Sequence, residues 1–205
     1  MRTLLLYILS ISHLIGNTYP GDGDVINSLH IKFEWPVESS GTDWQLQFLT
    51  ADESSTNIAT IQVTDDDADG YFEYINDNSA GFFTWNTTYK WQWKVFPFGN
   101  FNDPIEFSIG PAKTNVNVTI HDEDNYAEGY TIFASMNGTY SGIVDMLGNE
   151  IWNSGDQQFI YYNTDYHGTF WGAQYDESLN HQYPSVEFSL KNDIIWSEPN
   201  IRDTH

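Results

Sequence analysis

The feature that most constrains this chain is an alternation of large apolar and polar residues with a period of two. It is clearest in three segments, 31–35, 44–48 and 91–95, where every second residue is aromatic or aliphatic. This period places the apolar side chains on one face of an extended strand, whereas a helix needs a period of about 3.6. Clusters of Gly, Ser, Asn and Asp separate the segments and suit turns. Since no helical period follows residue 19, the sequence predicts an all-β protein.

The first half of the chain is predicted to form a two-sheet sandwich. Expected strands cover 31–35, 44–48, 61–63, 71–75, 91–95 and 105–109. Short strands at this spacing favour a sandwich. Trp35, Trp91 and Trp93 are predicted to anchor its core, each contributing very roughly 1.5–3 kcal/mol through burial. The alternative is that these tryptophans form a platform on which sugars stack.

The second half contains a repeat. Residues 143–152 match residues 187–196 at an offset of 44, and each copy is predicted to be a strand, a tight turn and a strand ending on Ile-Trp. A further strand is expected upstream of each copy, at 130–134 and at 169–173. Repeats of about 40–50 residues with several strands each are typical of β-propeller blades. An acidic stretch between the two halves predicts a linker at 116–127.

Composition excludes several classes of partner. The formal net charge is −22, with only seven Lys and Arg residues, so nucleic acid is excluded and anionic membrane surfaces are disfavoured. Aromatic residues make up 17% of the chain, which is far too many for a disordered acidic protein. The chain has no cysteine and therefore no disulfide, so its domains must be stabilised by their cores.

Residues 1–19 are predicted to be a signal peptide. Arg2 provides the positive start, and the apolar run up to Ile15 is shorter than the roughly 20 residues that a membrane-spanning helix needs. This predicts a protein that is secreted, periplasmic or on the cell surface. The cleavage site is poorly defined, so a retained N-terminal anchor is the alternative. No later segment is apolar enough to cross a membrane as a helix.

One segment resembles part of a calcium loop. Asp65, Asp67 and Asp69, followed by Gly70, fit the first half of an EF-hand-type loop, but Asn76 stands where a bidentate Glu belongs. Two interpretations remain: an acidic hairpin turn, or a weak calcium site. No other cofactor is predicted, and the histidines are not spaced as zinc ligands.

Two stretches of the first half resemble a fibronectin type III domain. Residues 88–95, a Gly-Asn turn and residues 104–109 are similar to its last two strands, and residues 33–36 to its early Trp-bearing strand. The resemblance implies a fibronectin type III or immunoglobulin-like sandwich over residues 20–115.

The second half resembles the first propeller blade of arylsulfotransferase-like proteins. The matching segments are 128–134, 139–145 and 148–152, and residues 203–205 resemble the start of that family's His-bearing blade segment. The resemblance implies an incomplete β-propeller of one or two blades over residues 128–205. It also implies sulfuryl transfer from an aryl sulfate to a phenolic acceptor through a histidine.

His205 is the only residue that the resemblance carries over as a candidate catalytic residue, the alternative being an exposed residue at the chain end. The family's nucleophilic His and its sulfate-binding Arg lie in blades outside the matched region. We therefore expect the chain to be an inactive N-terminal portion, unless several copies form a homo-oligomeric ring. The rival interpretations are a non-catalytic secreted module for adhesion or carbohydrate binding and a propeller enzyme of another class.

Overall fold

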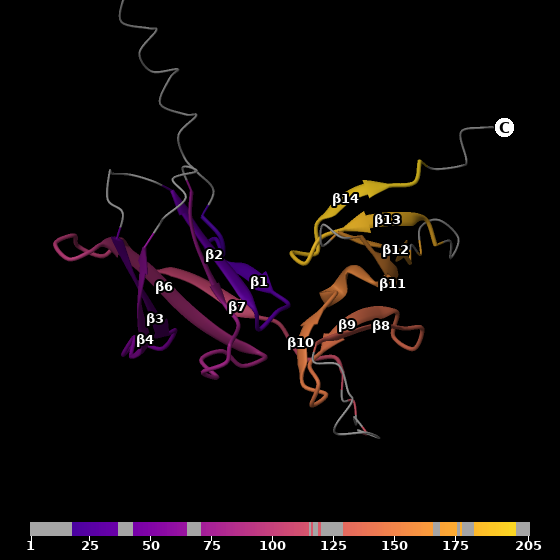
Figure 1. Cartoon of the computed structure of the whole chain (residues 1–205), viewed down its shortest axis with the longest axis horizontal. Coiled ribbons are helices and arrows are strands. Elements are labelled where there is room, and N and C mark those ends of the chain that lie inside the picture. The colour runs from indigo at the N-terminus through magenta and orange to yellow at the C-terminus, as the bar shows by residue number, and fades with distance from the viewer. Residues whose placement is uncertain are drawn as a thin grey trace, which may run out of the picture. The chain divides into compact units, whose positions relative to one another are not determined.

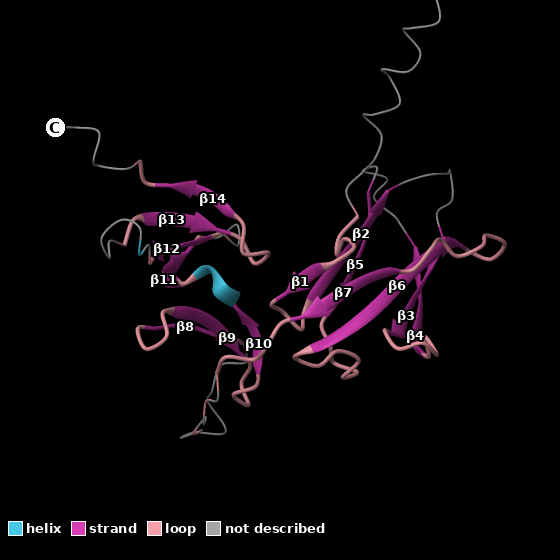
Figure 2. Cartoon of the chain, turned by 180° about the vertical axis from the view of Figure 1, so that it is seen from behind, coloured by secondary structure: helices cyan, strands magenta, loops and turns pink. Residues whose placement is uncertain are grey.

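The computed structural model confirms an all-β protein. It describes residues 18–36, 43–64, 71–114, 116, 119, 129–165, 169–175, 177 and 183–199. These ranges hold fourteen strands, a short 3-10 helix at Gly155–Gln157 and no α-helix (Figures 1 and 2). No helix there is long and apolar enough to cross a membrane. Most of the predicted signal peptide and of the predicted linker lies outside the described residues.

The strands follow one another with short connections. In chain order they are β1 (Asp24–Ile26), β2 (Ile31–Pro36), β3 (Asp43–Thr50), β4 (Asn57–Thr64), β5 (Tyr71–Asn76), β6 (Thr87–Val95), β7 (Ile105–Ile109), β8 (Thr131–Ser135), β9 (Tyr140–Val144), β10 (Glu150–Asn153), β11 (Phe159–Thr164), β12 (Phe170–Gln174), β13 (Ser185–Phe188) and β14 (Ile194–Ser197). The 3-10 helix η1 (Gly155–Gln157) lies between β10 and β11.

The strands form four open sheets. Two of them have the strand orders β1-β7-β6-β3-β4 and β2-β5. The other two are β10-β9-β8 and β11-β12-β13-β14. In both of these, neighbouring strands are antiparallel and consecutive in the chain, so each sheet is a meander built from local hairpins.

The chain divides into two compact units. The first unit comprises Met1–Asp24, Ile31–Phe82 and Thr88–Ser108, and the second comprises Val25–His30, Phe83–Thr87 and Ile109–His205. Two short segments from the N-terminal half therefore group with the C-terminal unit.

The core of the first unit forms as the alternation predicts. Strand β2 alternates buried and half-buried residues along its whole length, and β3 and β6 bury every second residue over most of theirs. Phe33 of β2 packs on Phe48 of β3 and on Trp91 of β6, with ring centroids 4.8 and 5.1 Å apart. The buried faces of the two sheets therefore meet. Trp35, Trp91 and Trp93 are buried, which confirms them as core residues and leaves no indole face for a sugar.

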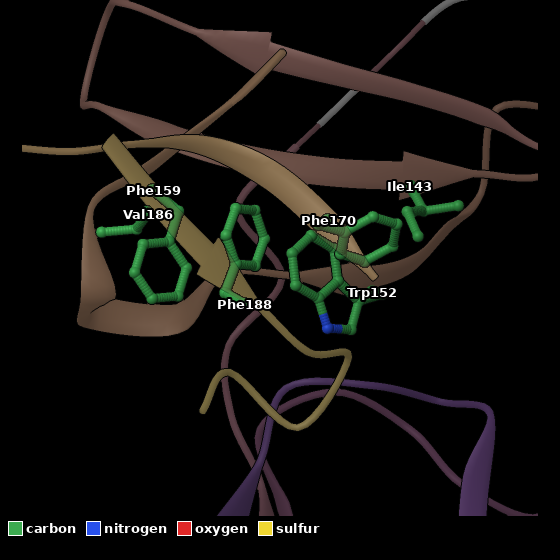
Figure 3. Close-up of a cluster of buried hydrophobic side chains, with 6 residues drawn as sticks. All are labelled: Ile143, Trp152, Phe159, Phe170, Val186 and Phe188. Atoms are coloured by element: carbon green, nitrogen blue, oxygen red, sulfur yellow. The ribbon is translucent and has the colours of Figure 1, made fainter. Parts of the chain in front are cut away.

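The core of the second unit lies between its two meander sheets. It is a cluster of buried side chains from both sheets: Ile143, Trp152, Phe159, Phe170, Val186 and Phe188 (Figure 3). The rings of Phe159 and Phe188 stack with centroids 4.3 Å apart, and Trp152 lies 5.6 Å from Phe170. Burial of such aromatic side chains supplies most of the energy that joins two sheets face to face.

Candidate functional site

The residues predicted to carry chemistry lie outside the part of the chain that the structure describes. This holds for Asp65, Asp67 and Asp69, the candidate calcium ligands, and for His205, the candidate catalytic residue. Within the described ranges no group of three or more His, Asp or Glu residues is arranged to hold a metal ion. The calcium site and the role of His205 therefore stay predictions.

A buried carboxylate in the second unit is the feature that sequence reasoning missed. Glu150 begins β10 and is only 5% exposed. Its carboxylate accepts hydrogen bonds from the backbone N–H of Lys113, at 3.0 Å, and from that of Thr114. The side-chain amide of Asn153, which is fully buried, donates to the same carboxylate. A buried carboxylate is tolerated when donors surround it in this way.

The Lys113 side chain does not contact this carboxylate. Its ammonium group donates to the carbonyl oxygen of Gly155 and lies 3.4 Å from the Asp156 carboxylate. The Trp85 indole donates to the backbone carbonyl oxygen of Glu150 at 3.3 Å. Donors of the chain itself therefore surround Glu150, and the contacts fasten residues 113–114 to β10. This is a structural role, because a carboxylate so engaged is not presented to a substrate.

Burial is the largest influence on the pKa of this carboxyl group. Removal from water raises the pKa of Glu150, and the hydrogen bonds from Asn153 and from the backbone of Lys113 and Thr114 offset the rise only in part. A carboxyl group with a higher pKa in the folded protein than in the unfolded chain binds its proton more tightly when folded. Its contribution to the free energy of unfolding is thus greatest below the ordinary glutamate pKa and is lost as the pH rises through the raised pKa.

The repeat seen in the sequence is also a repeat of backbone hydrogen bonds. In the β9–β10 hairpin, Asp145 N–H donates to Asn149 O at 2.9 Å and Gly148 N–H donates to Asp145 O at 3.0 Å. The β13–β14 hairpin has both bonds 44 residues later, where Ser189 N–H donates to Asp193 O at 3.0 Å and Asn192 N–H donates to Ser189 O at 2.9 Å. Gly148 and Asn192 both have a positive φ, which glycine and asparagine tolerate best.

The equivalence extends to the open ends of the two hairpins. In the first, Ser154 N–H donates to Ser141 O at 2.9 Å, while Ser141 N–H donates to the Ser154 hydroxyl at 3.1 Å. In the second, Glu198 N–H donates to Ser185 O at 2.8 Å, while Ser185 N–H donates to the Glu198 carboxylate at 3.1 Å. The two hairpins are therefore copies of one structural unit.

The two copies differ in what covers them. Trp152 is 2% exposed, and its indole N–H donates to Leu190 O at 2.7 Å. Trp196, at the same position of the second copy, is 44% exposed. Its ring lies 6.1 Å from that of Trp171, which is 40% exposed. The outward face of the second meander sheet therefore presents a pair of aromatic rings.

Comparison with known proteins places the chain in no family, since no family model and no curated protein matches it. The geometry defines a class of architecture, an all-β protein in which one hairpin unit is used twice in stacked sheets. Within the described residues, Glu150 and the Trp152 hairpin serve packing and sheet connection, whereas Trp171 and Trp196 are exposed.

Proposed function

We propose that this chain is the N-terminal part of an exported arylsulfotransferase-like protein. In this proposal residues 20–115 are a fibronectin type III-like sandwich, and residues 128–205 are the first blades of an incomplete β-propeller. The observation that carries the propeller assignment is the hairpin unit repeated at an offset of 44 in two meander sheets stacked face to face. Propeller blades are meander sheets of about four strands whose faces pack on their neighbours.

The assignment to sulfuryl transfer rests on the resemblance of residues 128–134, 139–145 and 148–152. In that chemistry a histidine nitrogen attacks the sulfur of an aryl sulfate, and the bond from sulfur to the aryl oxygen breaks. The sulfuryl group then passes from the histidine to the oxygen of a phenolic acceptor. His205 would belong to the sulfate pocket, and the described residues would act as the scaffold that carries it.

A second candidate function is a non-catalytic module for adhesion or carbohydrate binding outside the cell. The observation that favours it is the exposed pair Trp171 and Trp196, with ring centroids 6.1 Å apart. Aromatic faces of this kind offer apolar area beside a polar N–H group, which suits the face of a sugar ring.

Reading the gene beyond codon 205 separates the two functions. Further repeats of about 40–50 residues that bring in paired histidines and an arginine would support the enzyme. The longer protein should then release phenol from an aryl sulfate, and His205→Ala should reduce that release. A stop codon directly after His205 would contradict the proposal. Glycan binding that is lost in both Trp171→Ala and Trp196→Ala would favour the module instead.

A further inference from the structure

In the second unit, the β11–β14 sheet covers the first copy of the hairpin, formed by β9 and β10. Ser141 of β9 is fully buried, and its hydroxyl donates to Phe159 O at 2.9 Å and accepts from Tyr161 N–H at 2.8 Å. One serine hydroxyl therefore binds the backbone of β11, the first strand of the next sheet. This leaves both hydrogen-bonding functions of a buried hydroxyl satisfied.

The turn of the second hairpin completes the same interface. The Trp152 indole N–H donates to Leu190 O at 2.7 Å, and the Asn192 side-chain amide donates to Asn153 O at 3.2 Å. Both hydrogen bonds join the end of β10 to the turn after β13. The rings of Phe170 and Phe188 cover the Trp152 indole (Figure 3).

The outward face of the second sheet presents the same groups one repeat later. Ser185 takes the place of Ser141, and Trp196 takes the place of Trp152. Trp171 stands across from Glu187 just as Ile132 stands across from Ile143. We call Trp171, Ser185, Glu187 and Trp196 the Trp196 face. Its serine and both tryptophans are exposed.

We propose that the Trp196 face is an interaction surface for another β-sheet of the same repeat. The partner sheet offers a strand whose backbone C=O and N–H bind the Ser185 hydroxyl, aromatic rings that cover Trp196, and a turn carbonyl that accepts from its indole. These are the contacts that Ser141 and Trp152 already make within the chain. The proposal rests on the propeller organisation proposed above and specifies the partner of its open side.

Glu187 changes what the partner must supply. It stands where the first copy has Ile143, a member of the buried cluster. A carboxylate enclosed between two sheets needs a hydrogen-bond donor or a cation opposite it. The partner sheet therefore differs from β11–β14 at this point and carries a Lys, Arg, Asn or backbone N–H facing Glu187.

A second copy of this chain fits the face less well than a further repeat. Each copy carries a formal charge of −22, so two copies repel one another. The aromatic face that would cover Trp196, formed by Phe159, Phe170 and Phe188, is also already occupied by Trp152 of its own copy.

Cysteine labelling tests the proposal, because the natural chain has no cysteine and gives no background. Ser185→Cys is introduced, together with Glu187→Ile, into the full chain and into an extended chain, in which a copy of residues 155–198 follows Glu198. This places the copy at the same spacing from Trp196 that residues 155–198 have from Trp152. Glu187→Ile gives the Trp196 face the residue that the first copy has at this position, because the added copy of β11–β14 does not carry the partner that Glu187 needs. The rate of reaction with a thiol reagent is then measured in both proteins.

We expect the thiol of Ser185→Cys to react about tenfold more slowly, or slower still, in the extended chain, since burial limits access of the reagent. Ser54→Cys, exposed in the first unit, should react at one rate in both proteins. Ser141→Cys, buried in both, should stay slow. An unchanged rate at Ser185→Cys would overturn the proposal, whether the added copy folds elsewhere or not at all.

Two further measurements make the result specific. Phe159→Ser and Phe188→Ser, placed in the added copy only, should restore fast labelling, and continued protection would mean unspecific masking and overturn the proposal. Raising the concentration of the unextended chain should leave the rate unchanged. If labelling of the Ser185→Cys thiol slowed as the concentration rose, a second copy of the chain would be the partner of the Trp196 face. That result would contradict the proposal of a further repeat. None of these readouts depends on sulfotransferase activity, so the proposed enzyme can fail while this interface stands.

Discussion

Trp152 and Trp196 occupy the same position in two copies of one hairpin, so replacing each by alanine measures what the covering sheet contributes. Trp152 is 2% exposed, lies against Phe170 and Phe188, and donates its indole N–H to Leu190 O. Trp152→Ala should cost the second unit about 3–5 kcal/mol, because it leaves a cavity and takes the donor from that carbonyl. Trp196, 44% exposed, has much less buried area to lose, and Trp196→Ala should cost about 1 kcal/mol or less.

The comparison is made by urea denaturation of the full chain, followed by near-ultraviolet circular dichroism. Both variants are read from the unfolding transition of the second unit, so the difference between them does not depend on how the first unit unfolds. Trp152→Phe serves as an intermediate variant that keeps an aromatic ring and loses the hydrogen bond. Equal losses of stability for Trp152→Ala and Trp196→Ala would refute the reasoning, because burial by the neighbouring sheet would then not decide the cost.

The other predictions concern single groups. For Glu150, the stability of the second unit should fall as the pH rises from the ordinary glutamate pKa through the raised one, and Glu150→Gln should flatten this slope in urea titrations at several pH values; an unchanged slope would contradict the raised pKa. Calcium should bind weakly or not at all to Asp65, Asp67 and Asp69, because the bidentate ligand is missing, and a dissociation constant in the low micromolar range by calorimetry would show this to be wrong. The chain alone should release no phenol from an aryl sulfate above background, because a sulfate pocket needs several convergent donors; turnover that His205→Ala abolishes would point to a ring of several chains.

The strands were predictable because their signal is local. Apolar residues at every second position indicate an extended strand, because they then lie on one of its faces. The predicted segments of the first half correspond to β2–β7. The repeated hairpin was predictable for the same reason, since Gly148 and Asn192 provide the positive φ that its turn requires. Local patterns of this kind also identified Trp35 and Trp91 as core residues.

The structural role of Glu150 could not be read from the sequence. The only signal was an acidic residue at the start of a short apolar strand, which predicts an exposed side chain. Its burial depends on the backbone of Lys113 and Thr114, which lies more than thirty residues earlier in the chain and donates hydrogen bonds to its carboxylate. Contacts of this separation leave no periodic trace in either segment.

The amino-acid sequence by itself determined that the chain is all-β, where its strands lie apart from β1 and β11, and that one hairpin is used twice. The tertiary structure alone decided which of the equivalent residues are covered. Trp152 and Trp196 have the same local surroundings and the same turn, yet one is 2% exposed and the other 44%. The reason is that strand and turn formation depend on neighbours along the chain, whereas burial of these side chains depends on a second sheet. Of these two tryptophans, Trp152 alone has such a sheet packed on it within the described residues.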